Sequence, residues 1–250
     1  MVFNIAMEYW LILGLFSLYL YDLARFVGFN DILFTQGFKK AFSVQLGSQQ
    51  TACAKKYLYF ACPLQPHQLI FQLKWQLQPR HVSSDTLLQL TKFDHRLNVL
   101  KPLQPWMLIN GILTLVVFPI CLLFLHNIFI LAVLVILIYS LNLSLFLAVF
   151  RKRKVLQLNS KQSLNFFLDA LFCPPFALNL LKKLSLQLSP SMDALSFAQL
   201  YLNPVQLCHI QQAILEDIDE LIQQADDPAS EYFQQLLSMQ QQLKNLQKLI

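Results

Sequence analysis

The chain has 250 residues, of which 56% are hydrophobic and 13% are charged, whereas roughly a quarter are charged in a soluble globular domain. The formal net charge is +5, but a nucleic-acid-binding domain needs its Lys and Arg gathered on one folded face. Here the densest basic cluster directly follows a long apolar run, so composition argues against nucleic acid as a partner and favours a protein embedded in a membrane.

Residues 1–25 form an N-terminal apolar segment that we expect to be a transmembrane helix. The uncharged stretch from Tyr9 to Tyr21 is shorter than the about 20 residues that cross a hydrocarbon core. Trp10 and Tyr19, together with Tyr21, nevertheless suit the two membrane interfaces, where aromatic side chains are enriched. An in-plane or buried helix is the alternative.

Residues 26–101 are predicted to form a small α+β cytoplasmic module. Apolar and polar side chains alternate over residues 67–78, which is typical of a half-buried strand. Its apolar face would consist of Leu69, Phe71, Leu73, Trp75 and Leu77. Shorter strands are expected at 42–46 and 57–61, and the spacing of apolar residues predicts a helix over 87–100.

Residues 102–150 contain no Asp, Glu, Lys or Arg. A single helix over 106–150 would be about 68 Å long, since each residue adds about 1.5 Å, whereas a hydrocarbon core is about 30 Å thick. We therefore expect a two-span transmembrane hairpin, with helices near 106–125 and 128–150 and a turn at His126-Asn127. Both spans must be helical because lipid cannot satisfy backbone polar groups.

The basic residues predict the orientation of this hairpin. All 19 Lys and Arg lie outside it, and four of them follow it directly as Arg151, Lys152, Arg153 and Lys154. Because cytoplasmic flanks carry the excess of positive charge, both flanks of 102–150 are expected to be cytoplasmic. The chain would then be a multi-pass protein of the cell membrane, the inner membrane in a bacterium. The same four residues are expected to set topology and to contact headgroups of the lipid bilayer.

Polar residues inside the hairpin suggest how its helices pair. Counted outward from the turn, Asn110 lies level with residue 143, next to Asn142, and Thr114 lies level with Tyr139. Hydrogen bonds between these pairs, worth about 0.6 kcal/mol each, would fix the register of the two helices. The two spans contain no Asp, Glu, Lys, Arg or His, which argues against a proton or ion pathway through them.

Residues 151–188 combine the basic cluster with two short amphipathic helices. The double proline in Cys173-Pro174-Pro175 separates these helices, because proline cannot continue a helix. We expect the pair to lie at the membrane interface with Lys182 and Lys183 at headgroup level. A buried helical pair in a cytosolic domain is the alternative.

Residues 189–250 form an acidic helical tail. Apolar stripes on both sides of Asp226-Asp227-Pro228 predict a C-terminal helical hairpin, whose second half has heptad-like spacing. Two heptads are too few to assign an oligomeric state. A dense acidic block in the tail consists of Glu216, Asp217, Asp219, Glu220, Asp226, Asp227 and Glu231.

No motif in the chain carries a recognisable chemistry. The spacing of Cys53, Cys62 and His67 does not fit a zinc site, in which paired ligands stand two to four residues apart. The sequence contains neither a phosphate-binding loop nor a nucleophile elbow, and the five cysteines are scattered as in a reducing compartment. We therefore expect no catalytic, cofactor-binding or metal-binding residues.

These features predict an integral membrane protein that is mainly α. It would combine a transmembrane helical hairpin (two to three spans) with a small α+β cytoplasmic module and a C-terminal helical hairpin. The expected function is that of a non-enzymatic, membrane-anchored adaptor or assembly factor, which binds a protein partner through its tail. The alternative is a small accessory subunit of a membrane transporter or membrane enzyme complex. An autonomous membrane enzyme would need a polar cluster that the spacing of residues does not show.

Overall fold

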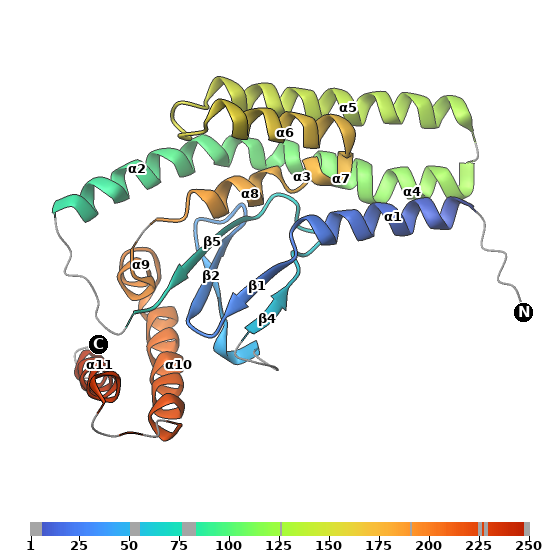
Figure 1. The fold of residues 1–250 in the computed structure, drawn as a ribbon. Helices are drawn as coiled ribbons and strands as arrows, with labels where there is room; N and C mark the ends of the chain where they lie inside the picture. The colour runs from blue at the N-terminus through green and yellow to red at the C-terminus, as the bar shows by residue number, and fades with distance from the viewer. Residues whose placement is uncertain are drawn as a thin grey trace, which may run out of the picture. The chain divides into compact units, whose positions relative to one another are not determined.

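The computed structural model describes residues 7–50, 56–76, 84–125, 127–190, 192–224, 227 and 230–247. Cys53, Leu77, Gln78, His126, Asp226 and Pro228, all considered above, lie outside these ranges. The fold is mostly helical with a small β part (Figure 1). Two compact units share the chain, and neither is one continuous run. The helical unit comprises Met1–Phe26, Leu58–Ile70 and Thr91–Leu188, and the sheet unit comprises Val27–Tyr57, Phe71–Leu90 and Ser189–Ile250.

The helical unit begins with α1 (Met7–Asp22), a Leu-rich helix without proline. Most of its large apolar side chains are exposed, including Tyr9, Trp10 and Leu13, whereas Tyr19 is fully buried. Helix α1 therefore exposes an apolar surface along most of its length and buries a tyrosine, Tyr19, near its C-terminus.

A second helical run continues without interruption from residue 84 to residue 125. It consists of α2 (Ser84–Leu100), η2 (Lys101–Leu103), α3 (Gln104–Ile112), η3 (Leu113–Val117), α4 (Phe118–Ile120) and η4 (Cys121–Leu125). The segments η3 and η4 are π-helical and flank Pro119 on both sides. Proline lacks an N–H and so leaves a backbone carbonyl without its usual donor. The wider π-turns accommodate that loss, and the helix continues past Pro119.

The returning helix is α5 (Ile128–Arg151). Asn127 caps it, because its Oδ1 accepts hydrogen bonds from the backbone N–H groups of Phe129 at 3.0 Å and Ile130 at 3.3 Å. Cys121, Leu134 and Ile138 form a small core between the two helices. Gln89–Leu125 and Ile128–Arg151 are each long and apolar enough to cross a membrane, judged by length and composition within the described residues.

Three shorter helices complete this unit: α6 (Ser160–Phe172), α7 (Pro174–Ala177) and α8 (Leu180–Gln187). Helix α6 ends before Cys173, and α7 begins directly after it, as the double proline predicts. Helix α6 runs back along α5 (Figure 1), and the rings of Phe146 and Phe167 lie 5.0 Å apart. Helix α7 contacts both α1 and α5.

The β part contains two small sheets. Strand β2 (Asp31–Gln36) lies between β3 (Ser43–Leu46) and β5 (Leu69–Lys74), and a second sheet pairs β1 (Arg25–Gly28) with β4 (Lys56–Tyr59). Strands β2 and β3 are antiparallel, with Ile32 opposite Leu46. All six residues of β2 are buried, which is expected of a central strand. A short 3-10 turn, η1 (Ser48–Gln50), follows β3.

The remaining helices of the sheet unit are α9 (Ala194–Tyr201), α10 (Pro204–Gln223) and α11 (Glu231–Gln247). Phe197 of α9 packs edge-on against Phe34 of β2 at 4.8 Å and against Phe42 at 5.5 Å. Helices α10 and α11 pack against each other. Their buried apolar residues include Ile210, Ile214, Ile218, Leu236, Met239 and Leu243. Strands from residues 26–101 and helices from the tail thus share one core.

Candidate functional site

Three of the four polar residues expected to pair inside the hairpin, Asn110, Thr114 and Asn142, are buried, Tyr139 is half-buried, and the structure joins one of the two pairs. Asn110 Nδ2 donates a hydrogen bond to Asn142 Oδ1 at 2.5 Å, and both side chains are buried. Thr114 and Tyr139 line the same cavity, but Thr114 Oγ1 has no hydrogen-bond partner within the described part of the chain. Among the described residues of the hairpin, the Asn110–Asn142 hydrogen bond is the polar contact between side chains of its two helices.

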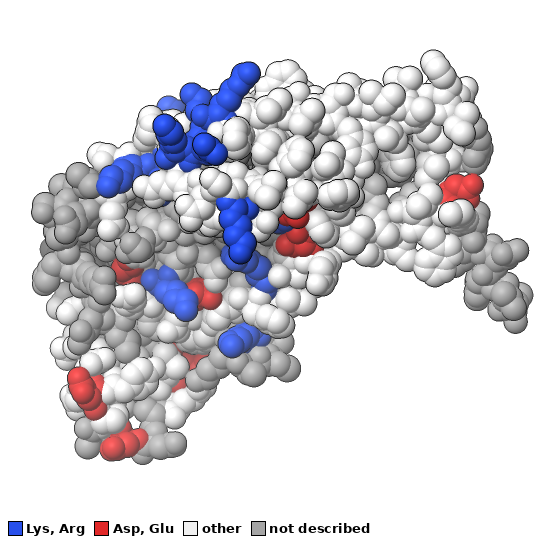
Figure 2. Space-filling model, turned by 45° about the horizontal axis from the view of Figure 1, so that its top comes forward, with Lys and Arg blue, Asp and Glu red and all other residues white. Residues whose placement is uncertain are grey.

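The basic cluster lies at the end of α5 and in the turn that follows. Arg151, Lys152 and Lys154 are exposed, and the guanidinium of Arg153 lies over the ring of Phe150 at 4.7 Å. Figure 2 shows Lys and Arg gathered at this end of α5 and α6, whereas the rest of the apolar helices is almost free of charge. None of the four cations forms an ion pair with another described residue.

A second polar cluster, centred on Lys182 of α8, was not expected from the sequence. The Lys182 side chain is fully buried, and its Nζ donates to Tyr19 Oη at 2.5 Å and to the carbonyl oxygen of Cys62 at 3.1 Å. Its Nζ also lies 5.1 Å from the centre of the Tyr19 ring, within range of a cation–π contact. Burial disfavours the charged ammonium and lowers the pKa of Lys182 to about 7.

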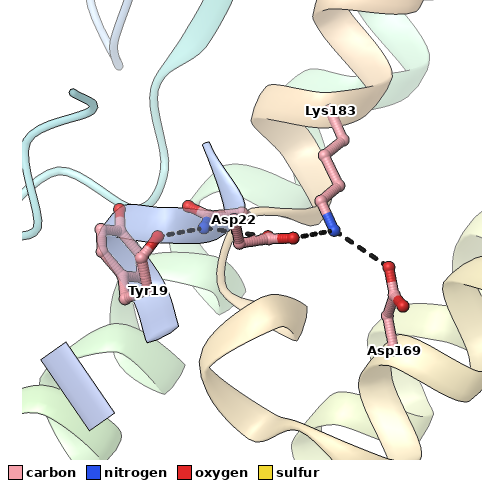
Figure 3. Close-up of polar contacts among 5 residues, drawn as sticks. Tyr19, Asp22, Asp169 and Lys183 are labelled. Carbon is pink, nitrogen blue, oxygen red and sulfur yellow. Dashed lines mark hydrogen bonds and ion pairs between the residues drawn. The ribbon is translucent and has the colours of Figure 1, made fainter. Parts of the chain in front are cut away.

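The neighbouring lysine has a different environment. Lys183 Nζ forms ion pairs with Asp22 Oδ1 at 2.7 Å and Asp169 Oδ2 at 2.9 Å (Figure 3). Asn179 extends this network, because its Nδ2 donates to the backbone oxygen of Tyr19 at 2.9 Å and to Asp22 Oδ2 at 3.1 Å. Two adjacent lysines thus connect α8 to α1 by different means.

This polar cluster connects parts of the helical unit that are far apart in the sequence. Lys182 connects α8 to α1 and to the segment 58–70, while Lys183 connects α8 to α1 and α6. Because Lys182 and Tyr19 have no exposed surface, no substrate can reach the Lys182 amine. The cluster is suited to holding helices together rather than to catalysis.

The expectation that both lysines lie at headgroup level is wrong for Lys182. Its side chain is fully buried, as are Leu180, Leu181 and Leu184 of α8, which agrees with the alternative of a buried helical pair. Sequence spacing carried a signal for this, since Leu178 and Ser185 stand four and three residues from Lys182 and are both buried. Residues at such spacings share one helix face.

Two apolar cavities lie within the helical unit. A cavity of about 430 Å³ is bounded by α1, by both helices of the hairpin and by the segment 172–175. A second cavity, of about 470 Å³, lies between α5 and α6 and is lined almost entirely by apolar side chains. Both have the size of small-molecule sites, which range from about 300 to 1,000 Å³.

Metal ligands do not converge in the described part of the chain. Cys62, Cys121, Cys173 and Cys208 are free thiols, and no group of three or more His, Cys, Asp or Glu side chains in that part could hold a metal ion. Cys62 contributes its backbone oxygen, not its thiol, to the Lys182 cluster.

Comparison with known proteins identifies no homologue for this chain. No protein family model, curated protein or solved structure matches it.

Proposed function

We propose that this chain is a non-enzymatic, membrane-anchored adaptor or assembly factor. The observation that carries the proposal is the outward apolar surface of the hairpin: the side chains of Phe124, Ile128 and Phe129 are 76%, 85% and 74% exposed. Soluble monomers rarely expose continuous apolar patches larger than a few hundred Å². A lipid environment would cover this surface.

The length and internal hydrogen bonding of α5 also suit a lipid environment. Its 24 residues extend over about 36 Å at 1.5 Å per residue, compared with about 30 Å for a hydrocarbon core. The hydroxyl groups of Ser140 and Ser144 donate to backbone oxygens of the same helix, each at 2.8 Å. These polar groups consequently need no water.

In the proposed arrangement, the basic cluster marks the cytoplasmic end of the hairpin and both flanks are cytoplasmic. Helix α1 is the third membrane helix of the proposal. Its described 16 residues extend over about 24 Å, less than a full hydrocarbon core, but Trp10, Leu11 and Leu13 present apolar side chains outward.

The sheet unit is the proposed partner-binding part. Helices α10 and α11 bury their apolar stripes, and carry exposed carboxylates at Glu216, Asp219, Glu220 and Glu231. An exposed acidic surface favours a partner with a basic patch, because complementary charge raises association rates and selects partners.

Membrane anchoring is tested by alkaline extraction of isolated membranes, combined with reporter fusions at residues 126 and 250. We expect the protein to resist extraction. A reporter that works only after export should be active when fused at residue 126, and a reporter that works only in the cytoplasm should be active when fused at residue 250. Release of the protein by alkali, or cytoplasmic activity at both positions, would contradict the proposal.

Partner binding is tested with the double variant E216K and E220K, compared with K39E at an exposed position of the same unit. Deleting the tail is a poorer test, because Ile210 and Ile214 of α10 are buried in the core. We expect the double variant to lose a co-purified protein, detected by mass spectrometry, which K39E and the wild type retain. Equal recovery from all three proteins would rule out the tail as the binding surface.

The alternative, an accessory subunit of a transporter or membrane enzyme complex, has one observation in its favour. Thr114 Oγ1 is buried beside the cavity between α1 and the hairpin, and it has no hydrogen-bond partner in the described part of the chain. A helix of a larger subunit seated there could supply that partner. This alternative predicts co-purification with large multi-spanning proteins, whereas the adaptor also binds soluble ones.

A further inference from the structure

We propose that the groove between α5 and α6 is a specific site for one anionic phospholipid. Its headgroup would lie at the basic cluster, and one acyl chain would occupy the apolar cavity of about 470 Å³. This inference rests on the proposed membrane anchoring and adds to it a site with a defined ligand class.

The cavity suits an alkyl chain because its walls offer almost no hydrogen-bonding groups. Leu143 and Phe146 line it from α5, and Phe167 and Leu171 line it from α6. Ser140 also lies in the wall, but its hydroxyl donates to the backbone oxygen of Ile136 at 2.8 Å. The surface is therefore apolar apart from Tyr139, and an alkyl chain would leave few polar groups without a partner.

A row of stacked side chains connects the cavity to the cations. The Phe146 ring lies 5.0 Å from Phe167 inside the cavity and 5.8 Å from Phe150 towards the end of α5. The guanidinium of Arg153 lies over Phe150 at 4.7 Å. The site is thus apolar at one end and cationic at the other, which matches a ligand with an alkyl chain and an anionic head.

The cationic end carries charge that the protein does not neutralise. Arg151, Lys152, Lys154 and, at the start of α6, Lys161 are exposed, and no described residue forms an ion pair with them. Lys183, in contrast, is paired with two carboxylates. Figure 2 shows the gathering of cations where α5 ends and α6 begins. Such a cluster attracts anionic lipid headgroups.

The direction of the groove also agrees with a phospholipid in the cytoplasmic leaflet. In the proposed topology the cations mark the cytoplasmic end of α5, and the cavity lies further along α5 towards residue 135. A phospholipid in that leaflet has the same order, with its phosphate at the interface and its chains towards the bilayer centre. A second copy of this chain has no such match, because its α5–α6 surface carries the same positive charge.

The site can be tested by native mass spectrometry of the full-length protein in detergent with two lipids of identical chains, phosphatidylglycerol and phosphatidylcholine. We expect the wild type to retain phosphatidylglycerol preferentially. R153Q and K161Q should each lower that preference about fivefold, in line with the contribution of one basic residue near an anionic surface. K92Q, which removes an exposed cation from α2, should not change it.

The cavity is tested separately by S140F, which adds a ring in its wall, and by L137F, which adds one on an exposed part of α5 outside it. We expect S140F to lose bound lipid of both kinds and L137F to retain it. Equal retention of the two lipids by the wild type, or equal behaviour of S140F and L137F, would overturn the inference. Cross-linking of two copies of the chain through α6, with no lipid bound, would also overturn the inference, because the groove would then be an interface between copies. If the protein resists alkaline extraction yet shows no lipid preference, only this inference fails; if alkali releases it, the proposed anchoring fails.

Discussion

Lys182 and Lys183 are adjacent residues with opposite energetic roles. Lys182 has a hydroxyl and a carbonyl as partners and no carboxylate, so its charge is poorly compensated, whereas Lys183 has two carboxylates. Removing a buried charge of the first kind is often neutral or stabilising, whereas removing one of the second kind leaves unpaired carboxylates. The pair therefore offers a matched comparison.

The variant K182M should unfold with a free energy within about 1 kcal/mol of the wild type at pH 7. In the wild type, burial lowers the pKa of Lys182 to about 7, so between about pH 7 and 10 the unfolded chain binds more protons than the folded one. Wild-type stability should therefore rise over that window, and K182M should lack this rise. Thermal unfolding in detergent across these pH values measures it, and identical slopes for both proteins would contradict the expectation.

The variant K183M should lose about 1–3 kcal/mol, because Asp22 and Asp169 then face each other without a cation. The loss should be similar at pH 7 and pH 9, which distinguishes it from the effect at Lys182. A K183M protein as stable as the wild type would show that the two ion pairs are too solvent-screened to matter. The same melting curves supply the measurement.

Asp217 of α10 is a second group whose protonation should affect stability. Burial raises the pKa of its carboxyl to about 6; the Ser48 hydrogen bond opposes this shift, and Glu220 and Glu216 add to it. The folded chain thus binds more protons than the unfolded one between about pH 4 and 6, and stability should fall as pH rises through that window. D217N removes the buried charge at pH 7 and should raise Tm there, by about 2–4 °C for each kcal/mol gained in the free energy of unfolding. E231Q, which changes an exposed carboxylate, should leave Tm unchanged.

At the scale of elements, two helical glycines differ in what a methyl group would meet. A Cβ at Gly111 of α3 would overlap the side chain of Pro66, which packs the segment 58–70 against this helix. A Cβ at Gly14 of α1 would meet nothing within 4 Å. Alanine is favoured over glycine in a helix interior by about 1 kcal/mol, so the two substitutions should have effects of opposite sign.

We expect G14A to stabilise the protein by about 0.5–1 kcal/mol and G111A to destabilise it by about 1–3 kcal/mol, since overpacking outweighs helix propensity there. The same detergent melting curves compare the two variants with the wild type. Stabilisation by G111A would mean that the segment 58–70 yields easily and is not fixed by Pro66.

The elements that could be predicted from the sequence are those whose side-chain period is strong. The apolar helices of the hairpin, the alternating strand around Leu69 and the break at Cys173 follow from local patterns. Strand β2 was not predicted from the sequence. All its residues are buried, so it lacks the alternation of apolar and polar residues that identifies a half-buried strand. The buried face of helix α6 could not be predicted either, because a short apolar helix does not reveal which stripe faces its neighbour; in the structure Phe166 is buried and Phe172 is exposed.

One polar contact of the candidate site could be predicted from the sequence, and the other polar cluster could not. Asn110 and Asn142 could be paired from the sequence because a helical hairpin has a fixed geometry, so counting from the turn gives the level of each residue. The Lys182 cluster could not, because its members Tyr19, Cys62 and Lys182 come from distant segments whose proximity depends on the packing of several helices. Long-range contacts of this kind leave no periodic pattern in one sequence.

At the scale of the whole molecule, the compact units do not follow the order of the chain. The sheet unit takes residues 27–57 and 71–90 from the first half of the chain and 189–250 from its end. Phe197 of the tail packs on Phe34 and Phe42, and the side chain of Asp193 accepts a hydrogen bond from the backbone N–H of Gln76 at 2.9 Å. The tail therefore depends on strands that precede the apolar hairpin.

A fragment of residues 189–250 should consequently not fold cooperatively by itself, because Phe197, Ile210 and Ile214 would lose part of their buried environment. Expressed together with residues 1–188, the same fragment should bind, become resistant to protease and co-purify. Circular dichroism melting of the isolated fragment and co-purification from membranes measure the two outcomes. A sharp melting transition of the isolated fragment would show that the acidic tail folds as an independent domain, attached to the rest of the chain by a tether and not as part of the sheet unit. Failure to co-purify would show that the tail does not bind the strands of residues 1–188.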